Sequence, residues 1–173
     1  MMNYCPQCGS RLTAGFVAGR ERPICEACGF VHYRNPAPIV LVSATLDGKL
    51  LQVRRLIEPL KGYWAPPGGY VEYDETVEDA VVREVKEETN LDVAIDGLLN
   101  VYSKPDTGIV FIAYRGRVIG GNPRAGEDAD AVAFFGPDEL HDQSAPDEGT
   151  ELDRWSFQVI SDIVKAFQRG GRT

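Results

Sequence analysis

The sequence lacks any long hydrophobic run. No stretch of about 18 consecutive apolar residues occurs, so we expect no membrane-spanning helix. The first residues, Met1 to Cys5, contain neither a basic segment nor an apolar core, which argues against a secretory signal peptide. We therefore expect a cytoplasmic protein, without membrane association, in a compartment where thiols stay reduced.

Positive charge is also scarce. The 18 lysine and arginine residues are outnumbered by 26 aspartate and glutamate residues, which gives a net charge of −8. Because an acidic chain repels polyanions, we expect no nucleic-acid partner, and a small phosphate-bearing substrate would need a metal ion or an arginine beside it. The remaining composition, 43% hydrophobic and 25% charged, is ordinary for a globular protein.

Cysteine is absent after residue 28. The four cysteines form the pattern C-x2-C-x16-C-x2-C, at Cys5, Cys8, Cys25 and Cys28. This spacing predicts a tetrahedral Zn²⁺ site whose thiolate ligands leave no open position, so the metal would be structural. Two disulfides or unrelated free thiols are the alternatives, and a reducing compartment disfavours the disulfides.

The cysteine-bearing segment predicts a small separate domain, a zinc ribbon over residues 1–34. About 30 residues cannot bury enough apolar surface to fold alone, but a structural Zn²⁺ supplies on the order of 10 kcal/mol. Residues 29–38 contain an Asn-Pro pair and a second proline, which is typical of a linker. The main domain is then predicted over residues 35–173.

The main domain mixes predicted strands and helices. Strands are predicted at 39–46, 50–55, 70–72, 91–102, 109–118 and 131–135, and helices at 76–89 and 151–168. Asp47-Gly48 is a hairpin signal, while 59–69 and 120–130 are predicted to be loops. Strands before and after a central helix predict a layered α/β domain.

Three glutamates gather on one face of the predicted helix 76–89, because Glu84, Glu87 and Glu88 are spaced i, i+3, i+4. In a cleft with an effective dielectric of about 20, their repulsion costs about 3 kcal/mol per pair, and a hard divalent cation removes that cost. Ligands that are all oxygen favour Mg²⁺ or Mn²⁺. The alternative is a solvated acidic helix, which a bare E-x-x-E-E pattern usually indicates.

A longer pattern surrounds these glutamates, formed by Gly69, Glu75, Arg83, Glu84, Val85, Glu87, Glu88 and Leu91. It resembles the Nudix box, G-x5-E-x7-R-E-U-x-E-E-x-G-U, in which U is aliphatic. Asn90 replaces the second glycine of the box. Asparagine tolerates the left-handed conformation expected where this helix ends, and the departure leaves the expected metal ligands intact.

The resemblance extends to both sides of the box. Residues 62–69, GYWAPPGG, look like the family's G-x-W-x-L-P-G-G lead-in, with Pro66 in place of the usual leucine. The ribbon, joined through Asn35-Pro36, resembles a zinc-ribbon subgroup that includes ADP-ribose and FAD pyrophosphatases. The similarity covers about residues 5–140 and implies a Nudix-type α/β/α sandwich with a mixed sheet.

The family assigns roles to the matched positions. The catalytic Mg²⁺ or Mn²⁺ would bridge the pyrophosphate oxygens and would be bound by Glu84, Glu87 and Glu88. Arg83 would orient these glutamates through charge-assisted hydrogen bonds, and Glu75 would support that network. Gly69 would allow a close approach of the backbone.

Three assignments stay open. The general base is either Glu84 or Glu127, and Glu127 lies in an acidic loop that is equally compatible with a surface position. Arg54 is a candidate for phosphate binding, but it points to the opposite face of the strand from Arg55, so at most one of them serves. Trp64 would either stack on a base or pack within the protein.

The resemblance indicates a reaction more firmly than a substrate. We expect Mg²⁺-dependent hydrolysis of ADP-ribose or FAD with release of AMP, and a homodimer is expected from the family alone. NADH pyrophosphatases carry S-Q-P-W-P-x-P-x-S after the box, whereas this chain has only Ser103-Lys104-Pro105-Asp106. NADH, other nucleotide sugars and nucleoside triphosphates stay open as substrates. A non-catalytic ligand sensor is the other alternative, although a sensor does not need the full set of glutamates.

Overall fold

The computed structural model describes residues 2–140 and 143–170 of the chain. They form two compact units that divide between Asn35 and Pro36, one residue beyond the first predicted domain. No helix in the described ranges is long and apolar enough to cross a membrane. Each unit is considered separately below.

The N-terminal unit is a two-stranded ribbon between two cysteine turns. Strand β1 (Thr13–Val17) pairs antiparallel with β2 (Arg20–Ile24). In each turn a glycine amide donates to a cysteine carbonyl, from Gly9 to Cys5 at 2.9 Å and from Gly29 to Cys25 at 2.8 Å. Both glycines have positive φ, 74° and 79°, which residues with a Cβ rarely adopt.

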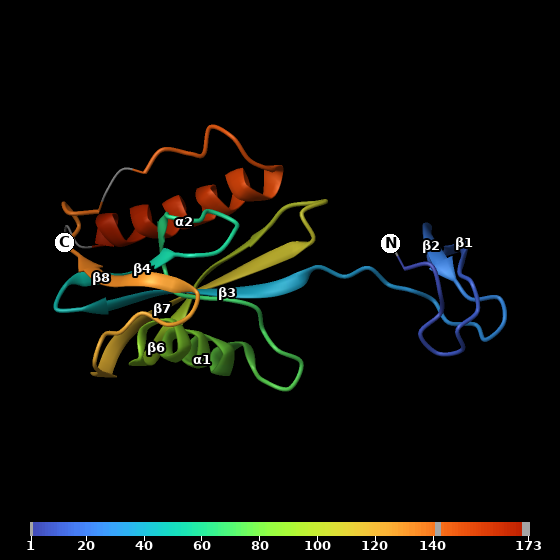
Figure 1. Cartoon of the computed structure of the whole chain (residues 1–173), viewed down its shortest axis with the longest axis horizontal. Coiled ribbons are helices and arrows are strands. Elements are labelled where there is room, and N and C mark those ends of the chain that lie inside the picture. The colour runs from blue at the N-terminus through green and yellow to red at the C-terminus, as the bar shows by residue number, and fades with distance from the viewer. Residues whose placement is uncertain (1, 141–142, 171–173) are drawn as a thin grey trace. The chain divides into compact units, whose positions relative to one another are not determined.

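The main unit is built on a mixed sheet with the order β5-β4-β3-β7-β6, and β8 pairs with β4 (Figure 1). The strands are β3 (Ala37–Leu46), β4 (Lys49–Arg55), β5 (Trp64–Ala65), β6 (Leu91–Ser103), β7 (Ile109–Gly121) and β8 (Ala129–Phe135). The central pair, β3 and β7, is parallel, and the other pairings are antiparallel.

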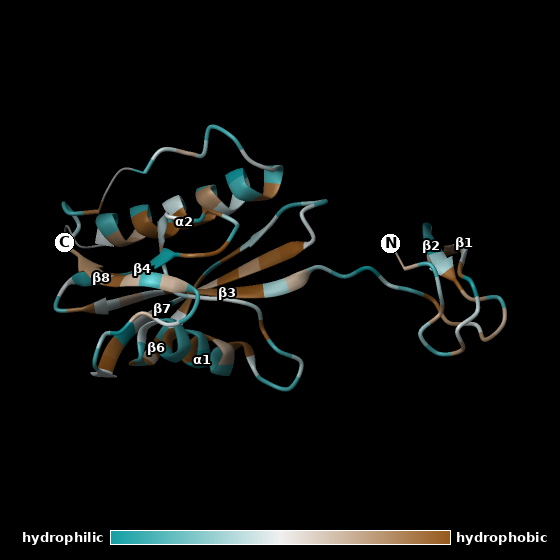
Figure 2. Ribbon diagram, viewed as in Figure 1, coloured by the Kyte–Doolittle hydropathy of each residue, from teal (hydrophilic) through white to brown (hydrophobic). Residues whose placement is uncertain are grey.

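Two helices, α1 (Val77–Thr89) and α2 (Glu151–Gly170), cover opposite faces of this sheet (Figure 1). Alternation along β3 supplies both cores: Val40 and Val42 pack with α1, while Leu41 packs with α2. Figure 2 shows that the central strands are largely apolar, whereas each helix carries both polar and apolar residues. The predicted sandwich with a mixed sheet is confirmed.

Helix α1 has clear caps at both ends. The hydroxyl of Thr76 accepts a hydrogen bond from the Asp79 amide at 3.1 Å, which satisfies one of the free donors of the first turn. At the other end, Asn90 adopts the left-handed conformation, with φ 59° and ψ 18°. This is the conformation expected where the Nudix box normally has glycine.

Several predicted boundaries were wrong. The predicted loop 59–69 contains the short strand β5, and the predicted strand 70–72 makes only an isolated bridge, between Tyr70 and Ile39. Strand β7 continues to Gly121 because it pairs with the start of β6, so the predicted loop 120–130 is shorter. The two ribbon strands were not predicted, because each is only five residues long and neither shows a clear alternation of apolar and polar residues.

Strands β3 and β4 pair only beside their turn, at Thr45↔Leu50 and Leu46↔Lys49. Beyond that point the segment 67–69 takes the place of a strand next to β3. The amide of Val42 donates to the carbonyl of Pro67 at 3.0 Å, and that of Val40 donates to Gly69 at 2.8 Å. This insertion brings the Gly68-Gly69 pair between the sheet and α1.

Candidate active site

The Gly68-Gly69 pair lies in close contact with β3 and with Glu84 of α1. A Cβ on Gly68 would lie 2.0 Å from the carbonyl oxygen of Val40, and a Cβ on Gly69 would lie 2.3 Å from Oε1 of Glu84. Beside β3, the backbone at position 68 therefore has no room for a Cβ, and at position 69 a Cβ would displace the Glu84 carboxylate. This geometry agrees with the close approach expected at Gly69.

Arg83 organises the carboxylates around it. Its guanidinium grips Glu75 through two hydrogen bonds of 2.7 and 3.0 Å, and Nη1 donates to Glu84 at 2.8 Å and to Glu87 at 2.9 Å. The hydrogen bonds from Arg83 lower the pKa of Glu75 to about 2. The network fixes three acidic side chains with one cation, which is the arrangement predicted for Arg83 and Glu75.

Glu88 is the most enclosed of the box glutamates, with only 8% of its surface exposed. Its Oε2 accepts a hydrogen bond from the Gly68 amide at 3.0 Å. Burial raises the pKa of Glu88 to about 7, although the Gly68 hydrogen bond opposes the shift. Burial also raises the pKa of Glu84, against the effect of Arg83. A bound cation would favour the ionised form of both.

A loop before β8 carries another carboxylate to these glutamates. The amides of Arg124 and Gly126 donate to the last carbonyls of α1, at 2.9 and 3.0 Å, and the Leu56 amide donates to the carbonyl of Asp128 at 2.9 Å. Gly126 passes so close to α1 that a Cβ would lie 2.0 Å from the carbonyl oxygen of Glu87. The loop is thus fixed against both α1 and the end of β4.

This loop presents Asp128, not Glu127, to the box glutamates. Asp128 lines the same pocket as Glu84 and Glu88, whereas Glu127 lines a separate cleft beside Glu87. The sequence pattern indicated Glu127 as one of two candidate bases, beside Glu84, and gave no role to Asp128. The predicted loop was correctly located, but the residue that faces the pocket depends on how the loop docks on α1.

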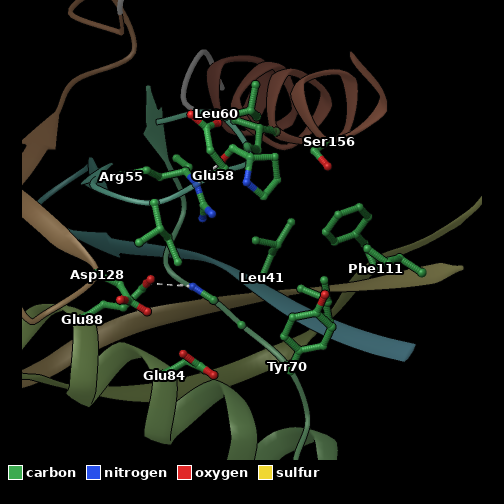
Figure 3. A pocket seen from close by; sticks show the side chains of 18 of the residues that line it. Leu41, Arg55, Glu58, Leu60, Tyr70, Glu84, Glu88, Phe111, Asp128 and Ser156 are labelled. Atoms are coloured by element: carbon green, nitrogen blue, oxygen red, sulfur yellow. Dashed lines mark hydrogen bonds between the residues drawn. The ribbon is translucent and has the colours of Figure 1, made fainter. Parts of the chain in front are cut away.

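The pocket itself measures about 310 Å³. Figure 3 shows Glu84, Glu88 and Asp128 gathered on one side of it, with Arg55 opposite Asp128. The remaining walls are mostly apolar and come from β3, β7, the loop after β4, and α2. The carboxylates with a bound cation, together with Arg55, would suit the polyanionic part of a ligand, and the apolar walls would suit a neutral part.

Of the two arginines that end β4, it is Arg55 that lines the pocket, and its Nε donates to the Pro59 carbonyl at 2.7 Å. Arg54, the residue predicted to bind phosphate, instead pairs with Asp130 through bonds of 2.7 and 3.0 Å. The two do point in different directions, as expected. A register shift between them, where β4 meets β8, makes the choice hard to predict.

Trp64 also lies outside the residues that line the pocket. Its ring meets the edge of Phe135, with centroids 5.0 Å apart, and the Arg54 guanidinium lies 5.8 Å from its centroid. Its amide and carbonyl are both hydrogen-bonded to the Gln143 side chain, at 2.8 and 2.9 Å. The structure therefore places Trp64 in a packing position and not in a stacking one.

The two predicted metal sites differ in how closely their ligands approach. The four cysteine sulfurs lie within 4.8 Å of one another, the one group of three or more potential ligands this close in the described ranges. All-sulfur donors at this spacing fit Zn²⁺. On α1, Glu87 turns to Arg83 and leaves 58% of its side chain exposed. Glu84 and Glu88 still fit Mg²⁺, which needs only one or two carboxylates besides water and phosphate oxygens.

Known family models match both units of this chain. The NUDIX domain family matches residues 33–156, which is more than half of the chain. The chain belongs to the Nudix family. The Nudix N-terminal family, a zinc ribbon, matches residues 3–34 and includes the four cysteines. The family resemblance and the ribbon expected from the sequence are both confirmed.

Curated relatives of this Nudix chain include an ADP-ribose pyrophosphatase and an NAD-capped RNA hydrolase. The ADP-ribose pyrophosphatase of Methanocaldococcus jannaschii is 46% identical over 107 residues, 60% of this chain and 63% of that protein. The NAD-capped RNA hydrolase NudC of Stutzerimonas stutzeri is 38% identical over 90 residues, 52% of this chain and 32% of that protein. The aligned parts thus cover less than two thirds of each relative.

Solved structures agree with the Nudix assignment. A NUDIX hydrolase from Nitrosomonas europaea superposes with a TM-score of 0.83 at 30% identity, over 97% of this chain and 91% of that one. An ADP-ribose pyrophosphatase from Streptococcus suis gives 0.58 at 25% identity, over 76% and 92% of the two chains. The near-complete coverage of the first includes the ribbon as well as the main domain.

Proposed function

We propose that this Nudix protein hydrolyses the pyrophosphate bond of a nucleoside diphosphate linked to a second group. ADP-ribose and FAD are the favoured substrates, and AMP is a product. The observation that carries the proposal is the meeting of Glu84, Glu88 and Asp128 at one end of a pocket, with Arg55 facing Asp128 at that same end. Such a site matches a pyrophosphate that approaches carboxylates through a divalent cation.

Glu84 and Glu88 would hold Mg²⁺ or Mn²⁺ in this site, with Glu87 joining them by leaving Arg83. The bound cation supplies charge neutralisation of the pyrophosphate and a more acidic water molecule. The chain itself supplies orientation: Arg83 fixes Glu84, and the Gly68 amide fixes Glu88. Arg55 adds a positive charge for a phosphate oxygen, since its Nη groups extend beyond the bond to Pro59.

Glu84 is our candidate for the general base. It lines the pocket, and the hydrogen bond from Arg83 at 2.8 Å orients its carboxylate there. Glu127, the other candidate, lines the neighbouring cleft, so it would have to move to reach the substrate. Asp128 takes its place as the carboxylate that the β8 loop contributes to the pocket.

The choice of ADP-ribose or FAD rests on likeness. The relative from Methanocaldococcus jannaschii is named an ADP-ribose pyrophosphatase and has the higher identity of the two described. NudC relatives favour a second candidate, cleavage of an NAD-type dinucleotide. Against it, this chain lacks the Trp-Pro pair of the NADH pyrophosphatase motif after the box.

A substrate panel tests the proposal directly. ADP-ribose, FAD, NADH, nucleotide sugars and nucleoside triphosphates would be incubated with the full chain and Mg²⁺, and AMP release would be followed by chromatography. We expect AMP from ADP-ribose or FAD, and a loss of at least about a hundredfold in kcat for Glu88→Gln.

The matched control is Glu78→Gln, on the same helix. Glu78 lies outside the pocket lining and accepts a hydrogen bond from the Tyr114 hydroxyl at 2.7 Å, which glutamine can also accept. This variant should turn over like the wild type. Binding of these nucleotides without any hydrolysis would support a ligand sensor instead, and undiminished turnover by Glu88→Gln would reject the metal site.

A further inference from the structure

Ser156 is the one polar residue that helix α2 contributes to the lining of the active-site pocket. Helix α2 contributes Leu152, Ser156 and Ile160 to the pocket, at i, i+4 and i+8 on one face. Two of these residues are apolar, as expected for a core-facing stripe. Ser156 interrupts the stripe although only 5% of its surface is exposed.

No hydrogen bond joins the Ser156 side chain to another residue within 2–140 and 143–170. Figure 3 shows its oxygen directed to the pocket, near Phe111 and across from Leu41. The oxygen is open to the pocket and is not sealed in the core, since within the described ranges Gln52 Nε2 is the one buried side-chain nitrogen or oxygen without a partner. An alanine at position 156 would serve packing alone equally well. The position therefore indicates a partner that the ligand brings.

The surroundings of Ser156 restrict the chemistry of that partner. The side chains facing it from β3 and β7 are hydrocarbon or aromatic: Ile39, Leu41, Ile109 and Phe111. A phosphate there would lose its hydration without compensation, and most hydroxyls of a sugar would lack a partner. A flat, uncharged heteroaromatic ring can bury its faces on these walls and still offer one polar edge to a hydroxyl.

We propose that this apolar part of the pocket binds the nucleobase of the substrate, and that the Ser156 hydroxyl hydrogen-bonds the edge of the base. The inference rests on the proposed function and adds the placement of the substrate's two halves. The phosphates lie at Glu84, Glu88 and Arg55, and the base lies between the sheet and α2. Ser156 is then a specificity residue, and it takes no part in the chemical step.

The two products of ADP-ribose hydrolysis allow binding at the base site to be tested separately from binding at the phosphate site. AMP carries the base, whereas ribose 5-phosphate does not. Their dissociation constants would be measured by NMR titration of the full chain in Mg²⁺. For the wild type we expect AMP to bind at least about tenfold more tightly than ribose 5-phosphate. For Ser156→Ala we expect AMP to weaken by about five- to tenfold, with ribose 5-phosphate unchanged.

Two further variants make the test selective. Ser156→Leu fills the space for the base, so it should abolish AMP binding while retained ribose 5-phosphate binding shows that the protein is folded. Ser161→Ala removes a hydroxyl from the same helix at a residue that lines a different pocket, so both ligands should bind as to the wild type.

Equal losses for both ligands in Ser156→Ala, unchanged AMP affinity, or tighter binding of ribose 5-phosphate than of AMP by the wild type would each overturn the assignment. These outcomes are independent of turnover. Hydrolysis of ADP-ribose with no effect of Ser156→Ala on AMP would reject this inference alone. Selective loss of AMP binding in a protein that hydrolyses nothing would reject the proposed function alone.

Discussion

At the scale of single residues, the room left by a glycine decides where a glutamate carboxylate can lie in the pocket. Gly69 shows this most clearly, because the space its Cβ would need is already taken by the Glu84 carboxylate. The catalytic end of the pocket therefore depends on a residue with no functional group of its own. The Glu84 carboxylate occupies the space that the missing Cβ of Gly69 leaves free.

Gly69→Ala should displace the Glu84 carboxylate, since the new Cβ would lie 2.3 Å from Oε1. A misplacement of about 1 Å in a catalytic group costs on the order of a hundredfold, so we expect kcat to fall by that factor. The unfolding temperature should change little, because the flexible end of one side chain can move. Gly120→Ala is the control, since its Cβ would approach only the exposed Asp92 carboxylate, at 3.2 Å. Normal kcat in Gly69→Ala would contradict this account.

Glu75 gives a prediction about acid stability. Its pKa is lowered to about 2 by Arg83, from the ordinary 4.5. Because the folded pKa is the lower one, the ion pair stabilises the protein fully above pH 4.5 and loses this effect as the pH falls toward 2. The difference in free energy of unfolding between the wild type and Glu75→Gln should therefore shrink over this range in chelator-treated protein.

Urea unfolding at a series of pH values measures that difference. Glu72→Gln, at an exposed neighbouring position, should show no comparable trend. A gap between the wild type and Glu75→Gln that stays constant from neutral pH down to about pH 2 would show that the pair with Arg83 contributes nothing to stability.

The position of Glu84 and Glu88 on one side of the pocket follows from their i, i+4 spacing on α1. The expectation of a role for Glu84, Glu88, Arg83 and Glu75 used only the i, i+3, i+4 geometry and the family pattern. The pocket-facing members of the pairs Arg54/Arg55 and Glu127/Asp128 were not predictable in the same way. A register shift in β4 and a loop docked on α1 decide them, and both depend on contacts between distant parts of the chain.

At the scale of elements, helix α1 ends in a way that the sequence does predict. Asn90 takes the left-handed conformation and also donates from its side chain to the Asn122 carbonyl at 2.9 Å. Both Asn90→Gly and Asn90→Ala lose that hydrogen bond, so their comparison isolates the backbone conformation. Asn90→Gly should be more stable than Asn90→Ala by about 1 kcal/mol.

Chemical denaturation of the two Asn90 variants gives this difference, with the metal removed so that ligand binding does not contribute. Equal stabilities would mean that the helix end relaxes to another conformation. A higher stability of Asn90→Ala than of Asn90→Gly would show that the left-handed backbone conformation at residue 90 does not determine stability here.

The position of residues 67–69 beside β3 could not be predicted from the sequence. Its backbone hydrogen bonds to Val40 and Val42 give the segment the neighbours of a strand, yet Pro67 and two glycines are residues that strands avoid. The sequence therefore predicts a loop, and the loop is nevertheless part of the sheet edge that forms the site. Long periodic elements such as β3, α1 and α2 were predicted well because their own side chains determine them.

At the scale of the whole molecule, the chain is two units with different sources of stability. The main unit has a core on each face of its sheet, whereas we expect the ribbon to be stabilised by a metal ion at its cysteine cluster. We expect about one zinc per chain by metal analysis, and its loss in Cys25→Ser.

Removing zinc should broaden or shift the NMR signals of residues 2–35 while those of 36–170 persist. A zinc-free purified protein with an ordered ribbon would contradict this prediction.

The central claim is that carboxylates of α1 hold a hard divalent cation against a pyrophosphate. Electron paramagnetic resonance of Mn²⁺ tests it most directly, because free Mn²⁺ gives a sharp signal that binding removes. We predict saturable Mn²⁺ binding by the wild type and by Glu78→Gln, and a loss of at least about tenfold in affinity for Glu84→Gln combined with Glu88→Gln. Equal Mn²⁺ affinity in the doubly substituted protein would contradict the account.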